Sequence, residues 1–252
     1  MSSIALITGA TSGFGKAIAE KFAKEGYDII ITGRRNELLE QVAEAIANKY
    51  QVKILTRNFD VRDKNAVNKE LKELPAEWQA IDILVNNAGL ALGKDYFDEA
   101  DIDDWETMID TNLKGLLYVS RAVIPFMVRS KKGHIINIGS IAGKNVYEKG
   151  NVYCSTKHAV GAISQAMRID MLRHKIKVTV IHPGAADTEF SIVRFKGNES
   201  AAKSVYEGYT PLYAEDIADA AYYCANTPPH VCINELVITP TAQADAYYLQ
   251  KD

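Results

Sequence analysis

Seven short apolar runs, most of them separated by amphipathic segments, are the feature that most restricts how this chain can fold. The runs are rich in Ile and Val, as in strands buried on both faces, while segments such as 15–26 and 37–50 repeat apolar residues at helical spacing. Strands that alternate with helices predict an α/β fold with a parallel sheet covered on both faces. We expect the strands at residues 4–8, 28–32, 52–58, 81–87, 133–140, 177–183 and 235–239.

The size and charge of the chain limit its domains and partners. Its 252 residues suffice for one large α/β domain, and no repeat or Pro/Gly/Ser-rich linker divides them. A net charge of -3 gives no general attraction to nucleic acid or anionic lipid. No apolar run approaches the roughly 18 residues that span a bilayer, and the first residues lack a secretory leader. We therefore expect a single cytoplasmic domain, residues 1–252, with neither nucleic acid nor membrane as a partner.

The three cysteines, Cys154, Cys224 and Cys232, form no CxxC pair. An odd number without such spacing is typical of reduced thiols rather than of a disulfide framework or a thiolate metal site. The five histidines also show no ligand spacing. We expect no bound metal.

A glycine-rich turn, TGATSGFG, follows the first predicted strand and opens the next helix. Glycines at such a turn let backbone N–H groups and the helix N-terminus approach a pyrophosphate. The spacing is GxxxGxG rather than the commoner GxGxxG, and a turn that only packs tightly is the alternative. Because the turn falls within a βαβ pattern, we expect it to bind phosphate. The expected contacts are Gly9, Thr11, Ser12, Gly13, Phe14 and Gly15.

The second predicted strand ends in ITGRR, where many NAD-binding proteins place an acidic residue on the ribose 2′-hydroxyl. Arg34 and Arg35 can instead pair with the 2′-phosphate of NADP, and neither can accept a hydrogen bond from a hydroxyl. A solvated basic pair is the alternative. These residues favour NADP as the cofactor.

Two further turns follow the third and fourth predicted strands. NFDVRD puts Asp60 and Val61 where an adenine ring could lie, and NNAG brings Asn86, Ala88 and Gly89 near the cofactor. Ligands of parallel α/β sheets bind beyond the carboxyl ends of the strands, which is where both turns fall. An alternative, in which the asparagines only tie strand ends together, is compatible with cofactor contact.

Three polar residues can converge after the fifth predicted strand. Ser140 ends that strand, while Tyr153 and Lys157 lie four positions apart on one face of the following helix. Tyrosine is a poor base at neutral pH, but a nearby ammonium stabilises the phenolate and lowers the tyrosine pKa. The small residues between the pair would leave room for the nicotinamide ribose and substrate. A surface helix pair is the alternative, but the nearby Ser140 and the glycine turn favour acid–base chemistry.

The motifs TGATSGFG, NNAG, TNLKG, GSIAG, YCSTK and HPG occur in this order over almost the whole chain. Together they resemble the short-chain dehydrogenase/reductase family. The resemblance implies a single-domain, doubly wound Rossmann fold with a seven-stranded parallel sheet and helices on both faces. It also implies a catalytic group made of Asn112, Ser140, Tyr153 and Lys157.

The same resemblance assigns roles to this group. Ser140 would hydrogen-bond the reacting oxygen, and Tyr153 would be the general base for oxidation or the acid for reduction. Lys157 would tune Tyr153 and hold the nicotinamide ribose. Asn112 would position a water that leads protons from Lys157 to solvent.

The segment after the sixth predicted strand would close the site. By resemblance, HPGAADTEF places Pro183, Gly184 and Thr188 at the nicotinamide, although two alanines depart from the usual pattern before Thr188. Residues at about 185–212 would form a substrate lid. The polar, glycine-containing stretch TEFSIVRFKGNES is typical of a mobile loop over a site.

Arg194 is the lid residue that most directly suggests a substrate. Its guanidinium could clamp a carboxylate through two hydrogen bonds, and a solvated basic loop is the alternative. EFSIVRFKG and the late INELVITPTAQ resemble the NADP-dependent 3-hydroxy acid dehydrogenase branch, which includes L-allo-threonine and serine dehydrogenases. We expect Ser140, Tyr153 and Arg194 to bind a small 3-hydroxy acid or 3-hydroxy amino acid, of the serine, allo-threonine or 3-hydroxypropionate type.

Two other functions remain open. One is the reduction of 3-oxoacyl groups on a carrier protein, or of carbonyl compounds in general, although the glycine-rich GQ…GG ending of the carrier-protein branch is absent. The other is a nucleotide-sensing protein that has lost its chemistry. The intact Ser140, Tyr153 and Lys157 argue against a sensor.

Two long segments, 104–131 and 151–174, carry apolar residues on more than one face. A helix of this kind needs more cover than its own sheet provides. Members of the family that the motifs resemble pair such helices across two-fold axes. We therefore expect a homotetramer.

Overall fold

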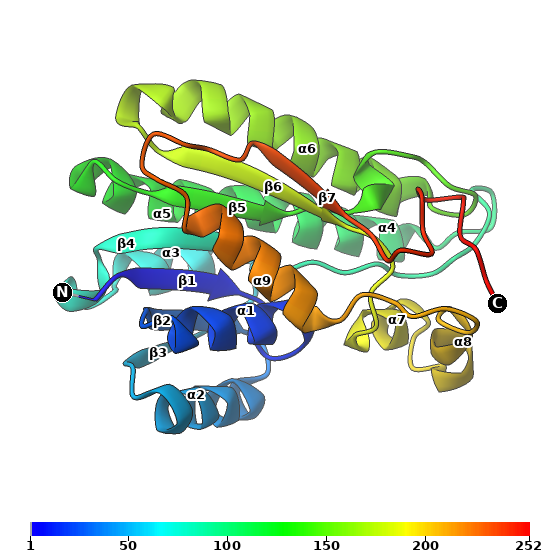
Figure 1. The fold of residues 1–252 in the computed structure, drawn as a ribbon, viewed down its shortest axis with the longest axis horizontal. Coiled ribbons are helices and arrows are strands. Elements are labelled where there is room, and N and C mark those ends of the chain that lie inside the picture. The colour runs from blue at the N-terminus through cyan, green and yellow to red at the C-terminus, as the bar shows by residue number, and fades with distance from the viewer. Residues whose placement is uncertain (1) are drawn as a thin grey trace.

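A single parallel sheet forms the centre of the protein, seen in a computed structural model that describes residues 2–252 (Figure 1). Its seven strands follow the order β3-β2-β1-β4-β5-β6-β7. The strands are β1 Ile4–Thr8, β2 Asp28–Gly33, β3 Ile54–Asn58, β4 Ile81–Asn86, β5 His134–Ile138, β6 Lys177–Pro183 and β7 Glu235–Ile238. The predicted Rossmann fold with a seven-stranded sheet is confirmed.

Helices cover both faces of the sheet. The helices α1, α2 and α9 bury apolar residues in one core, and α3 and α5 bury theirs in a second core on the opposite face, with α6 packed against it (Figure 1). The long helices are α1 Gly13–Lys24, α2 Asn36–Tyr50, α3 Lys64–Lys72, α4 Ile102–Ile109, α5 Leu116–Ser130, α6 Asn151–Met171 and α9 Ala214–Ala225. Strands buried from both sides read as continuous apolar runs, which is why the sequence shows them clearly.

Strand ends differ from the predicted ranges by up to two residues. The predicted strand 52–58 begins at Ile54, and the predicted strand 133–140 is only His134–Ile138. Gly139 still donates a backbone hydrogen bond to Ile181 O, at 2.7 Å, just beyond the end of β5. The apolar pattern therefore locates each strand, whereas its ends depend on where backbone pairing stops.

The order of the strands fixes where a ligand can bind. After β3 the chain returns to the other side of β1, so that β4 pairs with β1 and the loops after these two strands diverge. Such a switch point opens a crevice at the carboxyl ends of the strands. Two short helices, α7 Glu189–Arg194 and α8 Glu199–Ser204, lie beyond this edge (Figure 1).

The helices α4 and α5 are joined without a loop by a wide π-helical turn, Asp110–Gly115. Gly115 lets this turn approach the loop after β3, because an added Cβ would lie 2.7 Å from Val61 Cγ2. Within residues 2–252 no helix has both the length and the apolar character needed to cross a bilayer.

Candidate active site

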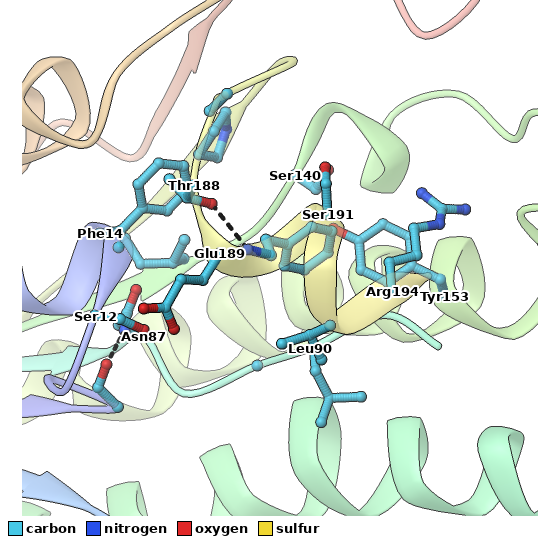
Figure 2. A pocket seen from close by; sticks show the side chains of 18 of the residues that line it. Ser12, Phe14, Asn87, Leu90, Ser140, Tyr153, Thr188, Glu189, Ser191 and Arg194 are labelled. Carbon is cyan, nitrogen blue, oxygen red and sulfur yellow. Dashed lines mark hydrogen bonds between the residues drawn. The ribbon is translucent and has the colours of Figure 1, made fainter. Parts of the chain in front are cut away.

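A cavity of about 920 Å³ opens at the carboxyl edge of the sheet. Its walls come from the turns after β1, β2, β3, β4, β5 and β6, and from α6, α7 and α8. In Figure 2, Tyr153 and Arg194 lie toward one end of the cavity, and Ser12 and Glu189 toward the other. We call these the substrate end and the adenosine end.

The glycine turn forms one wall of the cavity. Gly9 and Gly13 have left-handed backbones, with φ of 67° and 50°, and both line the cavity. Gly15 does not line it, because it faces the turn itself, and an added Cβ there would lie 2.3 Å from Gly9 O. Two glycines therefore shape the cradle and the third lets α1 pack against it. Of the six residues expected at a pyrophosphate, those on the cavity wall are Gly9, Thr11, Ser12, Gly13 and Phe14.

Arg34 and Arg35 line the adenosine end of the cavity, and both are paired with acids. Arg34 Nη1 lies 3.7 Å from Asp60 Oδ2. Arg35 Nη1 lies 3.2 Å from Glu189 Oε2, and Arg35 Nη2 also donates to Thr11 Oγ1 at 2.8 Å and to Ser12 Oγ at 3.0 Å. Both arginine side chains are more than half exposed. A phosphate could therefore reach them from solvent or from the cavity.

The turns after β3 and β4 contribute as expected, with one exception. Asp60, Val61, Ala88 and Gly89 line the cavity. Asn86 does not, because its side chain is buried beneath the cavity floor and donates to Ser120 Oγ and Asn137 Oδ1, both at 2.8 Å. The prediction of a cofactor contact by Asn86 is wrong, since the last residue of β4 points its side chain into the interior.

Asn87, next along the chain, takes the place expected of Asn86. Its side chain donates to Thr8 O at 2.8 Å and to Gly9 O at 3.2 Å, and the residue lines the cavity. It holds the glycine turn to the end of β4. Alternation of side chains along the strand was the signal that could have separated these neighbours.

Ser140, Tyr153 and Lys157 all line the same cavity. Ser140 begins a short 3₁₀ turn, Ile141–Gly143, and its Oγ accepts a hydrogen bond from Ala142 N at 3.1 Å. Tyr153 and Lys157 lie one turn apart on α6, and both are buried. The Lys157 Nζ donates to Ile138 O at 2.9 Å, which fixes the ammonium against the end of β5.

Burial dominates the pKa of both groups. Desolvation raises the pKa of the Tyr153 phenol above its usual value, and the Tyr147 ring beside it acts in the same direction. Ser140 and the Arg194 guanidinium act against this rise. Burial lowers the pKa of Lys157 from its usual 10.5 to about 8. The cation that most opposes the rise in the Tyr153 pKa is therefore Arg194, whereas the sequence pattern suggested Lys157 alone.

The small residues between Tyr153 and Lys157 do not open space for a ligand, contrary to our expectation. Cys154 is fully buried behind Tyr153 in an apolar cluster, and neither it nor Ser155 nor Thr156 lines the cavity. Thr156 Oγ1 donates to Tyr153 O at 2.8 Å and accepts from Asn112 Nδ2 at 3.1 Å. Only one face of α6 meets the cavity, and these three residues lie on its other faces. Their small side chains let the helix pack closely against the rest of the protein.

Asn112 lies in the wide turn between α4 and α5, and its side chain is fully used in hydrogen bonds. Its Oδ1 accepts from Leu90 N at 2.8 Å, and its Nδ2 donates to Leu90 O at 2.8 Å. The residue is buried and does not line the cavity. It joins the loop after β4 to α6, which makes it a positioning residue for Tyr153 and Lys157.

One wall of the cavity is formed by the last residue of β6 and by residues that follow this strand. Pro183, Gly184 and Thr188 line the wall, and Thr188 Oγ1 caps α7 by accepting from Phe190 N at 3.2 Å (Figure 2). The lid segment expected to be a loop contains the short helices α7 and α8. Helix formation follows from caps at both starts, because Asn198 Oδ1 accepts from Ala201 N at the start of α8.

Arg194 is held at the substrate end by both its backbone and its side chain. Gly93 N donates to Arg194 O at 3.1 Å, and Arg194 Nε donates to Gly93 O at 3.3 Å. The guanidinium carbon lies 5.5 Å from the centre of the Tyr147 ring and 5.7 Å from that of Tyr153. Within residues 2–252 no carboxylate pairs with it.

Several lining residues were not predicted from the sequence. Lys94 and Tyr147 lie outside the quoted motifs, whereas Thr111, Glu189 and Phe190 lie within motifs whose roles were assigned to other residues. Thr111 is notable because its Oγ1 is buried without a partner among the described residues. The unpredicted lining residues that matter most for the site are Lys94, Thr111, Tyr147, Glu189 and Phe190.

A doubly wound sheet with a glycine cradle, a basic adenosine end and a Ser–Tyr–Lys group defines a dinucleotide-dependent oxidoreductase site. A family model described as short chain dehydrogenase matches residues 3–199. The chain belongs to this family. The family resemblance read from the motifs is therefore confirmed.

Individual relatives cover nearly the whole chain. The NADP-dependent 3-hydroxy acid dehydrogenase of Escherichia coli K12 is 46% identical over 244 residues, which are 96% of this chain and 97% of that protein. Sulfoacetaldehyde reductase 2 of Chromohalobacter salexigens is 43% identical over the full length of both chains. A solved structure, the closed form of serine dehydrogenase complexed with NADP+, matches with a TM-score of 0.92 and 46% identity, covering 96% of this chain and 97% of that one.

Proposed function

We propose that the protein is an NADP-dependent oxidoreductase that acts on the 3-hydroxyl carbon of a small 3-hydroxy acid or 3-hydroxy amino acid. One observation carries the proposal. A single cavity is lined by two arginines that form ion pairs with carboxylates, by a Ser–Tyr–Lys group, and by Arg194, which forms no ion pair among the described residues. The similarity to an NADP-dependent 3-hydroxy acid dehydrogenase and to a serine dehydrogenase complexed with NADP+ supports the same class of reaction.

The cofactor fits the residues that line the cavity. Gly9 and Gly13 have left-handed backbone conformations that residues with a side chain rarely adopt. Without side chains at these two positions, the turn leaves space for a pyrophosphate. Arg34 and Arg35 offer charge-assisted hydrogen bonds to a 2′-phosphate. Gly89 lines the cavity beside Lys157, since an added Cβ would lie 3.6 Å from Lys157 Nζ. When bound, NADP supplies the acceptor or donor of a hydride.

The residues of the chain move and hold the proton. Ser140 donates a hydrogen bond to the reacting oxygen and orients it toward the Tyr153 phenol. In oxidation Tyr153 takes the hydroxyl proton, and in reduction it returns one. Lys157 and Arg194 lie within about 6 Å of the phenol ring, at 6.0 and 5.7 Å from its centre, so both stabilise the phenolate formed during oxidation. Asn112 keeps α6 in register with the loop after β4.

Arg194 binds the substrate carboxylate. Its guanidinium is stacked against Tyr147 and Tyr153 and has no acidic partner among the described residues, so its outer N–H groups can form the two hydrogen bonds that a carboxylate accepts. This favours free acids over acyl thioesters on a carrier protein, which lack that charge. Reduction of neutral carbonyl compounds remains the second candidate, because Ser140 and Tyr153 act without the arginine.

Turnover of NADP with matched substrates tests this function. Serine, allo-threonine and 3-hydroxypropionate should be oxidised, and a neutral alcohol of similar size should react poorly. Arg194→Ala should lower kcat/KM toward the acids about ten- to hundredfold more than toward the alcohol, which should lose only the contribution of Arg194 to the Tyr153 phenolate. Equal losses on acid and alcohol would show that Arg194 only orders the lid. Turnover of neutral carbonyls alone would contradict the acid assignment.

We further propose that the protein is a cytoplasmic homotetramer. Leu117 on α5, Ile169 on α6 and Leu172 at the end of α6 are exposed by 39%, 74% and 74%, so apolar surface lies on the outer side of these helices. A cytoplasmic site is supported by the three cysteines, which are all free thiols. A light-scattering mass near that of one 27.8 kDa chain at micromolar concentration would exclude the tetramer.

A further inference from the structure

Lys94 places a second cation at the substrate end of the cavity, beside Arg194. The residue before it, Gly93, exchanges two hydrogen bonds with Arg194, and both Lys94 and Arg194 line the cavity. Burial lowers the pKa of Lys94, and the charges of Arg194 and Lys149 lower it further. Lys94 is exposed at the cavity wall, and the effect of Arg194 on its pKa indicates that the two like charges repel one another.

Acids do not offset this pair of charges inside the cavity. Among residues 2–252, the carboxylates that line the cavity belong to Asp60 and Glu189. Both lie at the adenosine end, where Asp60 pairs with Arg34 and Arg62, and Glu189 pairs with Arg35.

Acids near Lys94 lie outside the cavity. Glu148 raises the pKa of Lys94 slightly and accepts a hydrogen bond from Tyr96 OH at 3.0 Å, but it does not line the cavity. Among the described residues Lys94 has no acid within ion-pair distance. The substrate end thus carries two cations without a neutralising carboxylate.

A site of this kind favours a substrate with two negative groups. A carboxylate bound to Arg194 neutralises that guanidinium and leaves the Lys94 ammonium uncompensated. A second anionic group of the substrate is then attracted to Lys94 and also reduces the repulsion between the two cations. The ammonium of a 3-hydroxy amino acid meets the opposite condition. Within the part of the chain described here, no carboxylate at the substrate end is available to bind it.

We propose that Lys94 is a specificity residue that binds a second anionic group, so that the preferred substrates are doubly charged 3-hydroxy acids rather than 3-hydroxy amino acids. This inference rests on the proposed function, because it assumes that Arg194 binds the first carboxylate. It assigns Lys94 to substrate recognition and gives it no part in proton or hydride transfer.

The test compares 3-hydroxyglutarate with its monoamide, which has nearly the same size and one charge less. The wild-type protein should prefer the diacid in kcat/KM. Lys94→Met should reduce the ratio of diacid to monoamide about tenfold, mainly through KM for the diacid. Lys94→Arg should restore most of the ratio, and the KM for NADP should change less than twofold in both variants.

Lys149→Met is the matched control. Lys149 is a nearby lysine that lies outside the cavity, with its Nζ 4.0 Å from the centre of the Tyr96 ring. It contributes to the local field without reaching the substrate, so the control should leave the diacid-to-monoamide ratio within twofold of wild type. A similar fall in both lysine variants would show a general field effect and would overturn the assignment to Lys94.

The remaining outcomes separate this inference from the proposed function. An unchanged ratio in Lys94→Met, with 3-hydroxypropionate still oxidised in an Arg194-dependent manner, overturns the inference alone. Serine turned over more efficiently than 3-hydroxyglutarate by the wild-type protein does the same. Failure to oxidise any 3-hydroxy acid overturns the proposed function as well.

Discussion

The two ends of the cavity both carry positive charge, but they hold it in different ways. At the adenosine end, Arg35 pairs with Glu189 at 3.2 Å and Arg34 lies 3.7 Å from Asp60. At the substrate end, Arg194 is held by aromatic rings and by Gly93. A ligand phosphate must compete with carboxylates at the first end, whereas a substrate carboxylate meets no competitor at the second. At the adenosine end, this competition disfavours ligands that lack the phosphate. At the substrate end, Arg194 is already held in position to bind a carboxylate.

Replacing Tyr153 by Phe should have the largest effect, because it removes the proton-transfer group at the substrate end and changes the charge of neither end. Proton transfer by a positioned acid or base contributes about 10²- to 10⁴-fold, so kcat should fall by that range. The Kd for NADP, measured by fluorescence titration, should stay within twofold of wild type. Substantial turnover by the variant would mean that another group moves the proton.

Replacing Arg35 by Ala tests the adenosine end. A charge-assisted hydrogen bond to a phosphate contributes about 1.5 to 3 kcal/mol, so kcat/KM with NADP should fall about ten- to hundredfold. With NAD it should hardly change, because NAD lacks the 2′-phosphate. The matched substitution Arg34→Ala should act in the same direction. If neither variant shifts the ratio of the two efficiencies, the 2′-phosphate does not bind at this end.

Lys157, between the two ends, should make the stability of the protein depend on alkaline pH. Its pKa is about 8 in the folded chain and near 10.5 when exposed. Between these values the unfolded chain binds the proton and the folded chain does not. The free energy of unfolding contributed by this group should therefore rise with pH, by at most about 1.4 kcal/mol per pH unit, and below pH 8 the full penalty of burying the charge remains.

Urea denaturation of the cofactor-free protein at pH 7 to 10 measures this slope. Lys157→Met is the control, since it keeps a side chain of similar length and shares every other titrating group. The difference in slope between wild type and variant isolates Lys157. Parallel curves would mean that the buried amine is already neutral at pH 7 or is more hydrated than its contacts indicate.

Glu189→Gln should have the smallest effect and the opposite sign. An exposed ion pair is worth about 0.2 to 1 kcal/mol, so removing the competitor for Arg35 should tighten NADP binding about two- to fivefold. NAD binding should not change. The gain should shrink at high salt, because these side chains are half exposed. Weaker NADP binding in this variant would show that Glu189 supports the phosphate site through the lid instead of competing with it.

Much of the fold could be predicted because the sheet is buried on both faces. The five residues of β1 and the last six of β6 are all buried, and each gives a nearly uninterrupted apolar run. The ends of strands were less predictable, since they depend on backbone pairing rather than on composition. The two lid helices were missed for a similar reason, because helices of six residues carry too few turns to show a period.

The residues of the candidate site likewise divide into those that could be predicted from the sequence and those that could not. Ser140, Tyr153 and Lys157 could be placed because local motifs fix them relative to one strand and one helix. Asn86 was misplaced by one residue, since only the alternation of side chains distinguishes it from Asn87. Lys94 gave no signal, because its position at the cavity depends on a contact between Gly93 and Arg194, 101 residues apart.

The wide turn at Asp110–Gly115 also makes this point of the chain more tolerant of a change in length than the helices beside it. A π-helical turn holds about one residue more than an α-helical turn, so a single deletion there would restore regular geometry and leave α5 facing the core. A single deletion within the first turn of α5 would instead rotate the rest of that helix by about 100°. The buried residues Val119, Val123 and Met127 would then leave the core. The two shortened chains would have the same length, but only the second deletion should strongly destabilise the fold.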